Sequence, residues 1–336
     1  MTVSTSARLH LGFLDLNGSL GRRFGSIGVA IDQPITRLMI SPSSETRIIG
    51  AQQPRLLSLL PRLLQELGLS GSVNVTLDSA IPSHQGLGSG TQLELALAAG
   101  LAALAGSPEP INRALTIIDR GARSGIGMAA FAQGGFLVDG GHKENPQSGE
   151  SQKSTPPILA RYDFCQDWRF ILLRDDNDQG LSGNSEKQAF AQLAPMADQS
   201  ASRLAQLVLM LLLPGLVEQD LTSVADALTE IQTLVGDYFA PAQGGSRFSN
   251  PRIAKLLEPM VASQLSKSRS QAYGIGQSSW GPTAFILVES QLVAEAVKAQ
   301  LISTIRQLSQ TDPQYQGLST VIVRGQNHGA KIEVIP

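Results

Sequence analysis

The sequence predicts an α+β protein built from two domains, and three observations support this fold class. The 336 residues are about twice the length of a usual single domain. Strand-like runs are interleaved with helical patterns in both halves, which favours an α+β fold over a doubly wound parallel sheet. Charged residues make up only 16% of the chain and aromatic residues 5%, as expected for a loop-rich globular protein.

The first half of the chain alternates between short strands and two helices. Alternating and β-branched residues predict strands at Thr2–Leu16, Ser26–Ile31, Thr36–Ile40 and Val73–Leu77. Helical spacing of leucines predicts a helix over Leu56–Leu67. The run Thr91–Leu104 is mostly alanine and leucine with one charge, at Glu94, so we expect a helix that is buried nearly all round.

The second half follows a polar segment, Lys143–Pro157, which has no apolar periodicity and is expected to be an exposed loop or linker. Strands are expected at Trp168–Leu173, Tyr273–Gly276, Thr283–Val288, Thr320–Val323 and Ala330–Ile335. Helices are expected at Glu186–Leu193, Gln199–Leu213, Leu221–Val235 and Leu292–Leu308. We place the domain boundary just after this loop, giving domains 1–165 and 166–336.

Charge and cysteine content exclude several classes of protein. The 26 basic and 28 acidic residues give a net charge of −2 with no long basic stripe, so we expect no nucleic-acid partner and no membrane partner. The single cysteine, Cys165, has no partner for a disulfide or a thiolate metal site, which fits a cytoplasmic location. We expect no export signal at the start of the chain. The longest apolar run, Leu204–Val217, contains Pro214 and is too short to span a bilayer, so we expect it to be a core helix.

A glycine-rich segment, IPSHQGLGSGT, lies between a predicted strand and the buried helix. A helix N-terminus offers unpaired N–H groups and about half a positive charge, and glycines let the backbone approach an anion. We therefore predict a phosphate-binding site formed by Gly86, Leu87, Gly88, Ser89, Gly90 and Thr91. Alone, these residues also fit a glycine-rich turn capped by Ser89. No GK[ST] or GxGxxG pattern indicates a P-loop or Rossmann site.

Two further glycine segments are candidate binding sites. In GARSGIGMAAFAQGGFLVDGG, Arg123 and Ser124 precede the glycines, and an arginine can hold a phosphate or carboxylate with two parallel hydrogen bonds. In GIGQSSWGP, the residues Ser278, Ser279 and Trp280 connect two predicted strands. A surface arginine and a glycine bulge are the simpler alternatives for these two segments.

The start of the chain supplies charged and polar side chains. Arg8, His10 and Gly12 alternate with apolar residues, so on a strand they share one face, which either lines a cleft or faces solvent. Further polar residues follow at Asp15, Asn17, Arg22 and Arg23. Other chemistries find little support, because the four histidines lack metal-ligand spacing and no GxSxG elbow occurs.

The order and spacing of the glycine segments resemble the GHMP small-molecule kinase superfamily, whose central motif is a proline, a short gap and then GLGSS; here it reads PSHQGLGSGT. Five segments are similar to one branch, the beta-ribofuranosylaminobenzene 5'-phosphate synthases: ARLHLGFLDLNG, GLGSGTQLELALA, RSGIGMAAFAQGGFLVDGG, GLSGNSE and GIGQSSWGPTAF. Together they run from Arg8 to Phe285. Five motifs in the same order are far more specific than any one of them.

The resemblance implies a GHMP-kinase-like fold with an N-terminal mixed α/β domain and a C-terminal ferredoxin-like α+β domain. It implies a decarboxylating pentosyltransferase that joins 4-aminobenzoate to phosphoribosyl pyrophosphate and releases CO₂ and pyrophosphate, in tetrahydromethanopterin biosynthesis. It also implies a Mg²⁺ requirement and a homodimer.

One departure from the kinases supports this branch. Resembling kinases such as mevalonate kinase carry an aspartate, the expected base, two residues after the SG of the second segment, where this chain has Gly127. Without a base, phosphoryl transfer to an alcohol loses about 10² to 10⁴ in rate. The alternatives are an ATP-dependent kinase in which Asp139 replaces that base, or a non-catalytic protein that binds phosphate esters.

On the main hypothesis, Mg²⁺ and the amides of residues 86–91 stabilise the departing diphosphate, which is where negative charge develops. We expect Arg8, Arg22 or Arg123 to hold the 5'-phosphate or the benzoate carboxylate, and Arg8, Asp15 and Arg123 to be catalytic. Asp15 and Thr91 are the expected metal ligands. Asn17, Arg22, Arg23, Ser124 and the third glycine segment are expected to bind substrate, and Trp280 either stacks on the aromatic ring or is a core residue.

Overall fold

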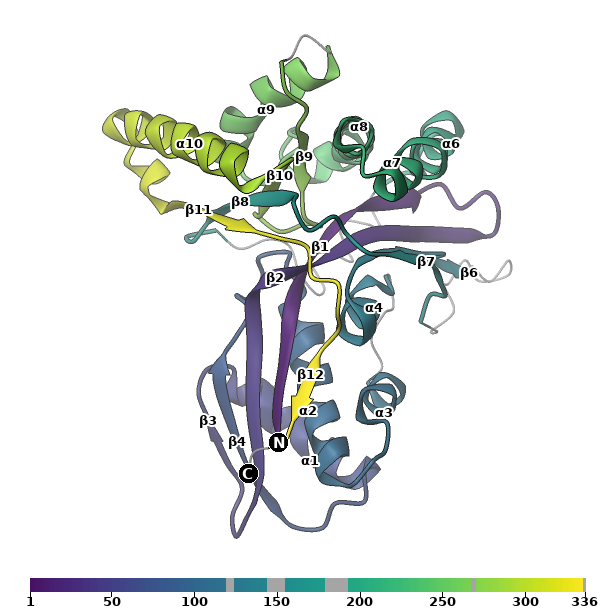
Figure 1. Cartoon of the computed structure of the whole chain (residues 1–336), viewed down its shortest axis with the longest axis vertical. Coiled ribbons are helices and arrows are strands. Elements are labelled where there is room, and N and C mark those ends of the chain that lie inside the picture. The colour runs from purple at the N-terminus through teal and green to yellow at the C-terminus, as the bar shows by residue number, and fades with distance from the viewer. Residues whose placement is uncertain (119–123, 144–154, 179–192, 267–269, 335–336) are drawn as a thin grey trace.

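Two sheets organise the chain in the computed structural model, which describes residues 1–118, 124–143, 155–178, 193–266 and 270–334 (Figure 1). The first sheet has the order β12-β1-β2-β4-β3, with β5, β6 and β7 attached along β2 and β5. The second sheet has the order β11-β8-β10-β9. Residues 186–192 of the expected helix Glu186–Leu193 and the central part of the expected linker, 144–154, fall outside the described residues.

The first sheet is built on two long strands, β1 (Thr2–Asp15) and β2 (Arg22–Ser43), which pair antiparallel from Thr2 with Met39 to Asp15 with Phe24. The sequence predicts two separate strands within β2, and this prediction is wrong. The stretch between them stays extended because its backbone pairs with the end of the chain: the amide of Asp32 donates to the Arg324 carbonyl. A local pattern cannot reveal a partner so distant in sequence.

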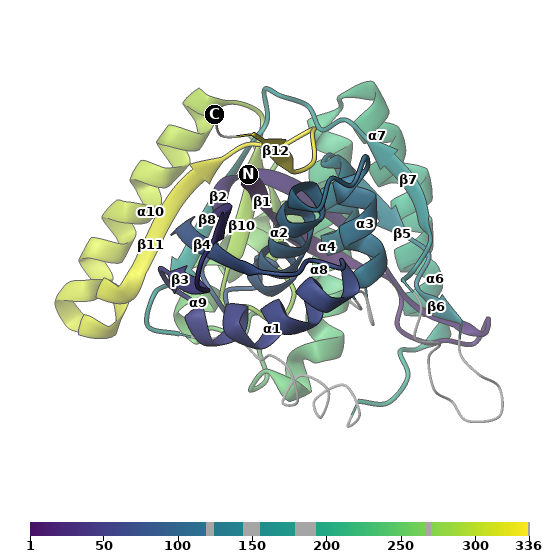
Figure 2. The same cartoon turned by 90° about the horizontal axis from the view of Figure 1, so that it is seen from below.

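The remaining strands of this sheet are β3 (Arg47–Ile49), β4 (Ser72–Ser79), β5 (Phe136–Asp139), β6 (His142–Lys143), β7 (Ile158–Tyr162) and β12 (Lys331–Glu333). Its helices are α1 (Gln53–Glu66), α2 (Ser89–Leu104), α3 (Pro110–Ile117) and α4 (Ile126–Gln133). Helices α1 and α2 lie side by side (Figure 2).

Helix α2 is the central buried element of the first domain, as its alanine and leucine content predicts. Every residue from Gln92 to Ala102 is buried. The helix crosses the sheet closely, since a methyl group added at Gly100 would lie 2.5 Å from the Ile40 Cδ1 atom. Burial of each leucine side chain contributes about 1.5–3 kcal/mol, so this helix anchors the loop that precedes it.

The second sheet has a ferredoxin-like topology, which confirms the expected C-terminal fold. Its strands are β8 (Arg169–Asp175), β9 (Gly274–Gln277), β10 (Ala284–Val288) and β11 (Leu318–Val323), so their chain order across the sheet is fourth, first, third, second. The helical elements are α6 (Asp198–Leu207), the π-helix η1 (Val208–Leu212), α7 (Leu213–Glu218), α8 (Leu221–Phe239), η2 (Ala240–Ala242), α9 (Pro251–Leu265), α10 (Gln291–Thr311) and η3 (Pro313–Gly317).

Side chains of β8 alternate between two cores. Phe170 and Leu172 pack with α8 and with the outer part of β1, while Ile171 and Leu173 pack with α9 and α10. The first of these cores is therefore continuous between the two sheets. The loops at the junction of the sheets are held by this shared core.

Helix α9 does not appear in the sequence prediction, although a start signal was present. Asn250 caps the helix, and its side-chain oxygen accepts hydrogen bonds from the amides of Arg252 and Ile253. Pro251 occupies the first turn, where its missing N–H costs nothing. An Asn-Pro pair before an apolar periodic run is the pattern that identifies this helix.

The chain passes from the first sheet to the second between β7 and β8, which is where the sequence places the domain boundary. The last strand, β12, then returns to the first sheet and pairs with β1, from Thr2 with Glu333 to Ser4 with Lys331. The segment 331–333 therefore belongs structurally to the first sheet. A boundary at residue 165 as a division into independent domains stays a prediction.

The apolar run around Pro214 forms a continuous helical segment, Asp198–Glu218, that includes η1. By length and composition alone this longer segment is apolar enough to cross a membrane, a test that the core helix of a soluble protein also passes. Pro214 does not end the helix because it lies in the first turn of α7. One face carries buried residues of the shared core, namely Leu204, Leu207, Val208, Leu212 and Leu216.

Candidate active site

The first glycine segment lies where β1 meets the turn between β9 and β10. The amide of Arg8 donates to the Leu87 carbonyl (3.1 Å), which a bulge in β1 after Ser6 makes possible. The Ser278 hydroxyl donates to the Gly86 carbonyl (2.8 Å) and accepts from the amide of His10 (3.0 Å). The structure thus brings together three segments that the sequence singles out separately.

The loop that precedes α2 exposes the first amides of this helix. Gly88 caps the helix with a left-handed backbone (φ 83°), which glycine adopts without strain. The carbonyls of Gly86 and Leu87 accept hydrogen bonds from Arg8, so they point away from the helix. These are the carbonyls one turn before Gly90 and Thr91, and Ser89 is the first residue of the helix, so the amides of all three residues lie at its open start. This is an anion-binding arrangement.

Two arginines contact this helix start, and the sequence analysis names only one of them. The guanidinium of Arg8 donates to the Gly86 carbonyl and lies below Gly88. The guanidinium of Arg55, from the first turn of α1, lies against Gly90. Arg55 pairs with Glu94, one turn into α2. In the sequence, the only feature that points to Arg55 is its position just before the expected helix Leu56–Leu67.

The other expected basic residues lie elsewhere. Arg22 donates to the carbonyls of Gly140 and Gly141 (both 2.9 Å), and the guanidinium of Arg23 lies 5.5 Å from the ring centre of Phe24. Both belong to the first residues of β2, some eight strand positions, or about 25 Å of strand, from the part of β2 that faces Arg8. The structure does not place them at the start of α2, and Arg123 falls outside the described residues.

Asp15 and Asn17 form a turn at the far end of β1. The Asp15 carboxylate accepts hydrogen bonds from the amides of Asn17 and Gly18, and the Asn17 side chain donates to the Met196 carbonyl. Asp15 is seven positions, roughly 20 Å of strand, from Arg8. Thr91 instead faces Gly127, so the structure does not bring the two expected metal ligands together.

The side chains around the helix start do not form a metal cage by themselves. No group of three or more His, Cys, Asp or Glu that fits a metal ion occurs among the described residues. Glu94, an acidic side chain of α2, is engaged by Arg55. Mg²⁺ needs near-octahedral oxygen ligands and often takes several of them from substrate phosphates. A resident magnesium site does not fit this donor set.

Asp139 is the last residue of β5, and its fully buried side chain lies beside the start of α4. Its carboxylate accepts hydrogen bonds from the amides of Gly125, Gly141 and Ser26 and from the hydroxyl of Ser124. Burial raises the pKa of Asp139 above its usual value, and the hydrogen bonds from Gly141, Gly125, Ser124 and Ser26 oppose this rise. Because its acceptors are occupied and it does not reach solvent, Asp139 is a structural carboxylate.

Gly127 faces the start of α2. A methyl group added there would lie 3.3 Å from the Thr91 Cγ2 atom and 3.7 Å from its hydroxyl oxygen. Any side chain at this position would therefore point at the first turn of the helix. The carbonyl of Gly127 accepts a hydrogen bond from the Gln92 side chain, which fixes its distance from the helix.

The third glycine segment supplies packing and backbone geometry. Ser278 is fully buried, and Ser279 has a left-handed backbone (φ 57°). Trp280 is buried, with its ring centre 4.5 Å from that of Phe239. Trp280, Phe239, Phe13 and other residues line a narrow hollow of about 20 Å³, which is about the room that one water needs. In this conformation Trp280 is a core aromatic.

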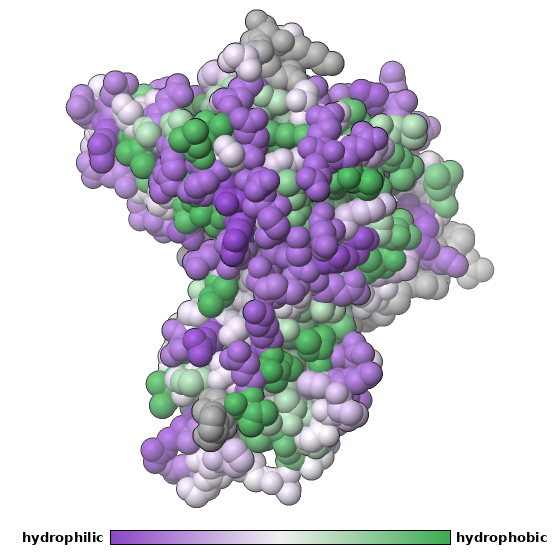
Figure 3. Space-filling view, viewed as in Figure 1, coloured by the Kyte–Doolittle hydropathy of each residue, from purple (hydrophilic) through white to green (hydrophobic). Residues whose placement is uncertain are grey.

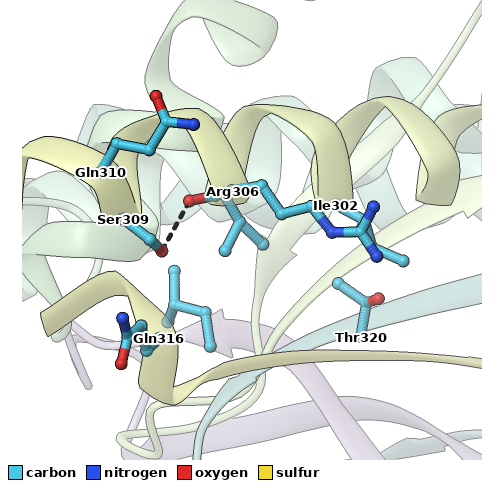
Figure 4. A pocket seen from close by; sticks show the side chains of 8 residues that line it. Ile302, Arg306, Ser309, Gln310, Gln316 and Thr320 are labelled. Atoms are coloured by element: carbon cyan, nitrogen blue, oxygen red, sulfur yellow. Dashed lines mark hydrogen bonds between the residues drawn. The ribbon is translucent and has the colours of Figure 1, made fainter. Parts of the chain in front are cut away.

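A wider groove lies on another face of the molecule, between α10 and β11 (Figure 4). It has a volume of about 750 Å³ and is lined by Ile302, Ile305, Arg306, Ser309, Gln310, Gln316, Leu318 and Thr320. Arg306 is the one charged side chain in its lining. The Ser309 hydroxyl donates to the Ile305 carbonyl. The groove contains no part of the three glycine segments.

Comparison with known proteins decides the family. The sequence matches the GHMP kinases N terminal domain over residues 55–135 and the GHMP kinases C terminal domain over residues 212–307. A beta-ribofuranosylphenol 5'-phosphate synthase from Methanothermobacter thermautotrophicus is 30% identical over 306 residues, which cover 87% of this chain and 89% of that protein. This chain belongs to the beta-ribofuranosylphenol 5'-phosphate synthase family.

A second member of the beta-ribofuranosylphenol 5'-phosphate synthase family, from Methanocaldococcus jannaschii, is 30% identical over 318 residues, covering 88% of this chain and 92% of that protein. Among solved structures, homoserine kinase from Cytophaga hutchinsonii has a TM-score of 0.60 at 16% identity and covers 98% of this chain and 96% of its own. That likeness confirms the GHMP-kinase-like fold. The expected enzyme family is confirmed, with a phenol in the relatives' name where aminobenzene was expected.

The geometry argues against one alternative function, an ATP-dependent kinase that uses Asp139 as its base. An ATP-dependent kinase would need a carboxylate base, and Asp139 was the expected replacement. Asp139 is buried and saturated with hydrogen bonds, and the position that faces Thr91 is Gly127. Asp139 is therefore not placed as that base, and position 127 supplies none.

Proposed function

We propose that this chain transfers the ribosyl 5'-phosphate group of phosphoribosyl pyrophosphate to the ring of a para-substituted benzoate, with loss of CO₂ and pyrophosphate, in tetrahydromethanopterin biosynthesis. The single observation that supports it is the start of α2: open amides at residues 89–91, Arg8 behind the loop and glycine in place of a base at position 127.

The helix start stabilises the leaving diphosphate. The bond between the ribosyl anomeric carbon and the diphosphate oxygen breaks, and negative charge grows on that oxygen. Donors that already point at this position lower the barrier because they need no reorganisation when the charge develops. Arg8 adds positive charge behind the loop at the same place. Mg²⁺ enters this proposal only as an ion chelated by the donor's own diphosphate.

The acceptor forms the new bond at the ring carbon that bears its carboxylate. Electron donation from the para substituent makes this carbon nucleophilic towards the anomeric carbon. The bond between the ring and the carboxylate then breaks, its electron pair restores aromaticity, and CO₂ leaves. Atoms and charge balance without an oxidant, a reductant or a base, which agrees with Gly127 at the position that faces Thr91.

The para substituent is either an amine or a hydroxyl. The resemblance within the sequence implies 4-aminobenzoate, whereas the relatives are named for a phenol product. Both groups donate electrons to the same ring carbon. We propose 4-aminobenzoate as the acceptor, with 4-hydroxybenzoate as the competing candidate that the name of the relatives favours.

Four of the expected substrate residues lie far from the helix start. Arg22 and Arg23 are about 25 Å of strand from the part of β2 that faces Arg8, and Asp15 and Asn17 follow Arg8 by roughly 20 Å or more. Because the ribose is bonded directly to the diphosphate, we do not assign its hydroxyls or its 5'-phosphate to these four residues. Ser124 lies next to the buried Asp139, and Trp280 stacks on the ring only if the hollow beside Phe239 opens. Arg123 stays a candidate for the 5'-phosphate or the carboxylate.

The test is a direct assay of the purified full-length chain. Phosphoribosyl pyrophosphate and Mg²⁺ are supplied with 4-aminobenzoate or 4-hydroxybenzoate labelled in the carboxyl carbon, and labelled CO₂ and pyrophosphate are measured together. Equal release of both products supports the transfer. Phosphorylation of small alcohols by ATP alone would instead establish a kinase, and donor binding without release of either product would establish a binding protein.

We also propose that the enzyme is a cytoplasmic homodimer. Exposed apolar side chains support a protein contact on the outer face of the segment Asp198–Glu218, where Leu209, Met210 and Val217 are 61%, 73% and 63% exposed. Apolar side chains also reach the surface in the region of α7 and β7 (Figure 3). Several exposed apolar side chains on one helical segment are more typical of a contact site than of a free surface.

A further inference from the structure

The starts of two helices meet at the glycine loop. Helix α1 begins next to it, because the side chain of Gln52 donates to the Ser83 hydroxyl (2.9 Å). Helix α2 begins at Ser89, at the other end of the loop. Both helix dipoles therefore place their positive ends beside the same short segment. Arg55, in the first turn of α1, adds a full positive charge there.

The guanidinium of Arg55 is held directly beside the α2 amides. Its Nε and Nη2 atoms donate to the same carboxylate oxygen of Glu94, at 3.2 and 2.8 Å. A methyl group added at Gly90 would lie 2.4 Å from Nη2 and 2.9 Å from Nη1 of this arginine. The guanidinium thus occupies the space that a side chain at Gly90 would fill, within reach of whatever the Gly90 amide binds.

The pair has features of a binding group that is positioned in advance. The Glu94 side chain is 9% exposed, whereas that of Arg55 is 33% exposed. A guanidinium has five N–H donors, and the two bonds to Glu94 leave others available. A buried ion pair is weak evidence for a stabilising role, because removal of its charges from water offsets the attraction. Its fixed geometry suits recognition of a second anion better.

We propose that Arg55 binds the diphosphate of the phosphoribosyl donor together with the amides of residues 89–91, and that Glu94 is the residue that positions it. This inference rests on the proposed function and adds a residue to the same site. Arginine suits the role because its planar fork matches two phosphate oxygens, which a lysine ammonium does not.

The experiment measures binding of inorganic pyrophosphate by calorimetry and steady-state kinetics for the donor. The variants are Arg55→Gln, Arg55→Lys and Glu94→Gln, and the control is Arg62→Gln, which removes an exposed arginine paired with Glu66 on the same helix. We expect Arg55→Gln to weaken pyrophosphate binding about ten- to hundredfold and to raise KM for the donor. Arg55→Lys should recover only part of this loss, and Arg62→Gln should match the wild type.

A second measurement uses the wild-type enzyme and does not depend on how the variants fold. Phenylglyoxal modifies accessible arginines, and mass spectrometry locates the modified residues. Pyrophosphate should protect Arg55 and leave Arg62 reactive. Modification of both arginines at unchanged rates, or equal pyrophosphate affinity in the wild type and Arg55→Gln, overturns the role of Arg55.

The outcomes separate the two proposals. If the wild type releases CO₂ and pyrophosphate but Arg55 is neither protected nor required, only this inference fails. If the wild type neither binds pyrophosphate nor releases these products, the proposed function fails. Loss of thermal stability in Glu94→Gln with unchanged pyrophosphate affinity would make Glu94 a structural residue and contradict its positioning role.

Discussion

The side chain of Arg8 lies directly beneath the backbone of Gly88: a methyl group added at Gly88 would come within 3.3 Å of two Arg8 carbons, Cγ and Cζ. The same guanidinium donates to the Gly86 carbonyl. The loop therefore depends on two conditions at once, a left-handed backbone at Gly88 and the absence of a side chain there. Both conditions keep the first amides of α2 open to a ligand.

We expect Gly88→Ala to reduce turnover at least tenfold. The matched control is Gly106→Ala, just after the end of the same helix, where the backbone is also left-handed (φ 78°) but nothing lies within 4 Å of the added methyl group. Both variants should lose about 1–2 kcal/mol of stability from backbone strain. Chemical denaturation and the CO₂ assay measure the two effects, and equal turnover in the two variants would contradict the anion site.

Gly127→Asp should lower kcat/KM for the donor at least tenfold. The new carboxylate would point at Thr91 and the first turn of α2, where it repels the diphosphate. Gly127→Asn has nearly the same size without the charge, so its loss should be clearly smaller. Steady-state kinetics with varied donor distinguishes them. Two equal losses would mean that crowding of Thr91, and not charge, sets the requirement for glycine.

Asp139 predicts a specific pH dependence of folding. Its folded-state pKa lies above its ordinary value of 3.8 because of burial, so the folded state binds more protons than the unfolded state between these two pKa values. Stability contributed by this group is therefore complete below pH 3.8 and falls as pH rises to the raised pKa. The unfolding free energy of the wild type minus that of Asp139→Asn should therefore decrease as pH rises over this range and then level off, because the asparagine does not titrate. Urea titrations from pH 4 to 7 provide the measurement, and a difference that grows with pH would be inconsistent with the raised pKa.

Replacement of Met210 by glutamate should dissociate the proposed homodimer. Met210 is 73% exposed beside Leu209, so a charge there costs little in the monomer but is unfavourable in an apolar contact. Leu292→Glu is the control, since Leu292 is 82% exposed on α10, away from this segment. Analytical ultracentrifugation gives the molecular mass. A wild-type monomer would refute the dimer, and a dimeric Met210→Glu would move its interface elsewhere.

The sequence predicts much of this fold because the relevant signals are local. The alanine and leucine composition of Thr91–Leu104 specifies a buried helix, and α2 is buried from Gln92 to Ala102. The glycines before it predict a turn, and in the structure Gly86 and Gly88 both adopt a left-handed backbone. The sequence does not predict β2 as one strand, because part of β2 pairs with the end of the chain, nor helix α9, whose start is marked only by the short Asn250-Pro251 pattern.

The site could be predicted only in part. The glycine loop, Arg8 and Ser278 meet as neighbours, yet the contact from Ser278 to Gly86 joins residues 192 apart, which no periodicity encodes. From the sequence, Arg22 and Asp15 are predicted to belong to the same site as Arg8 because they follow it closely along the chain. On an extended strand, each residue adds about 3.3 Å, so a short separation in sequence becomes a long one in space.

The sequence by itself determined the order of the elements, the conformations that glycine permits, the absence of an acid at position 127 and, through five motifs, the family. The tertiary structure alone decided which charges share a site. It placed Arg55 rather than Arg22 beside Gly90, and it enclosed Asp139 in hydrogen bonds where a base was one alternative. The physical reason is that conformation follows from neighbouring residues, whereas charge at a site depends on packing between segments far apart along the chain.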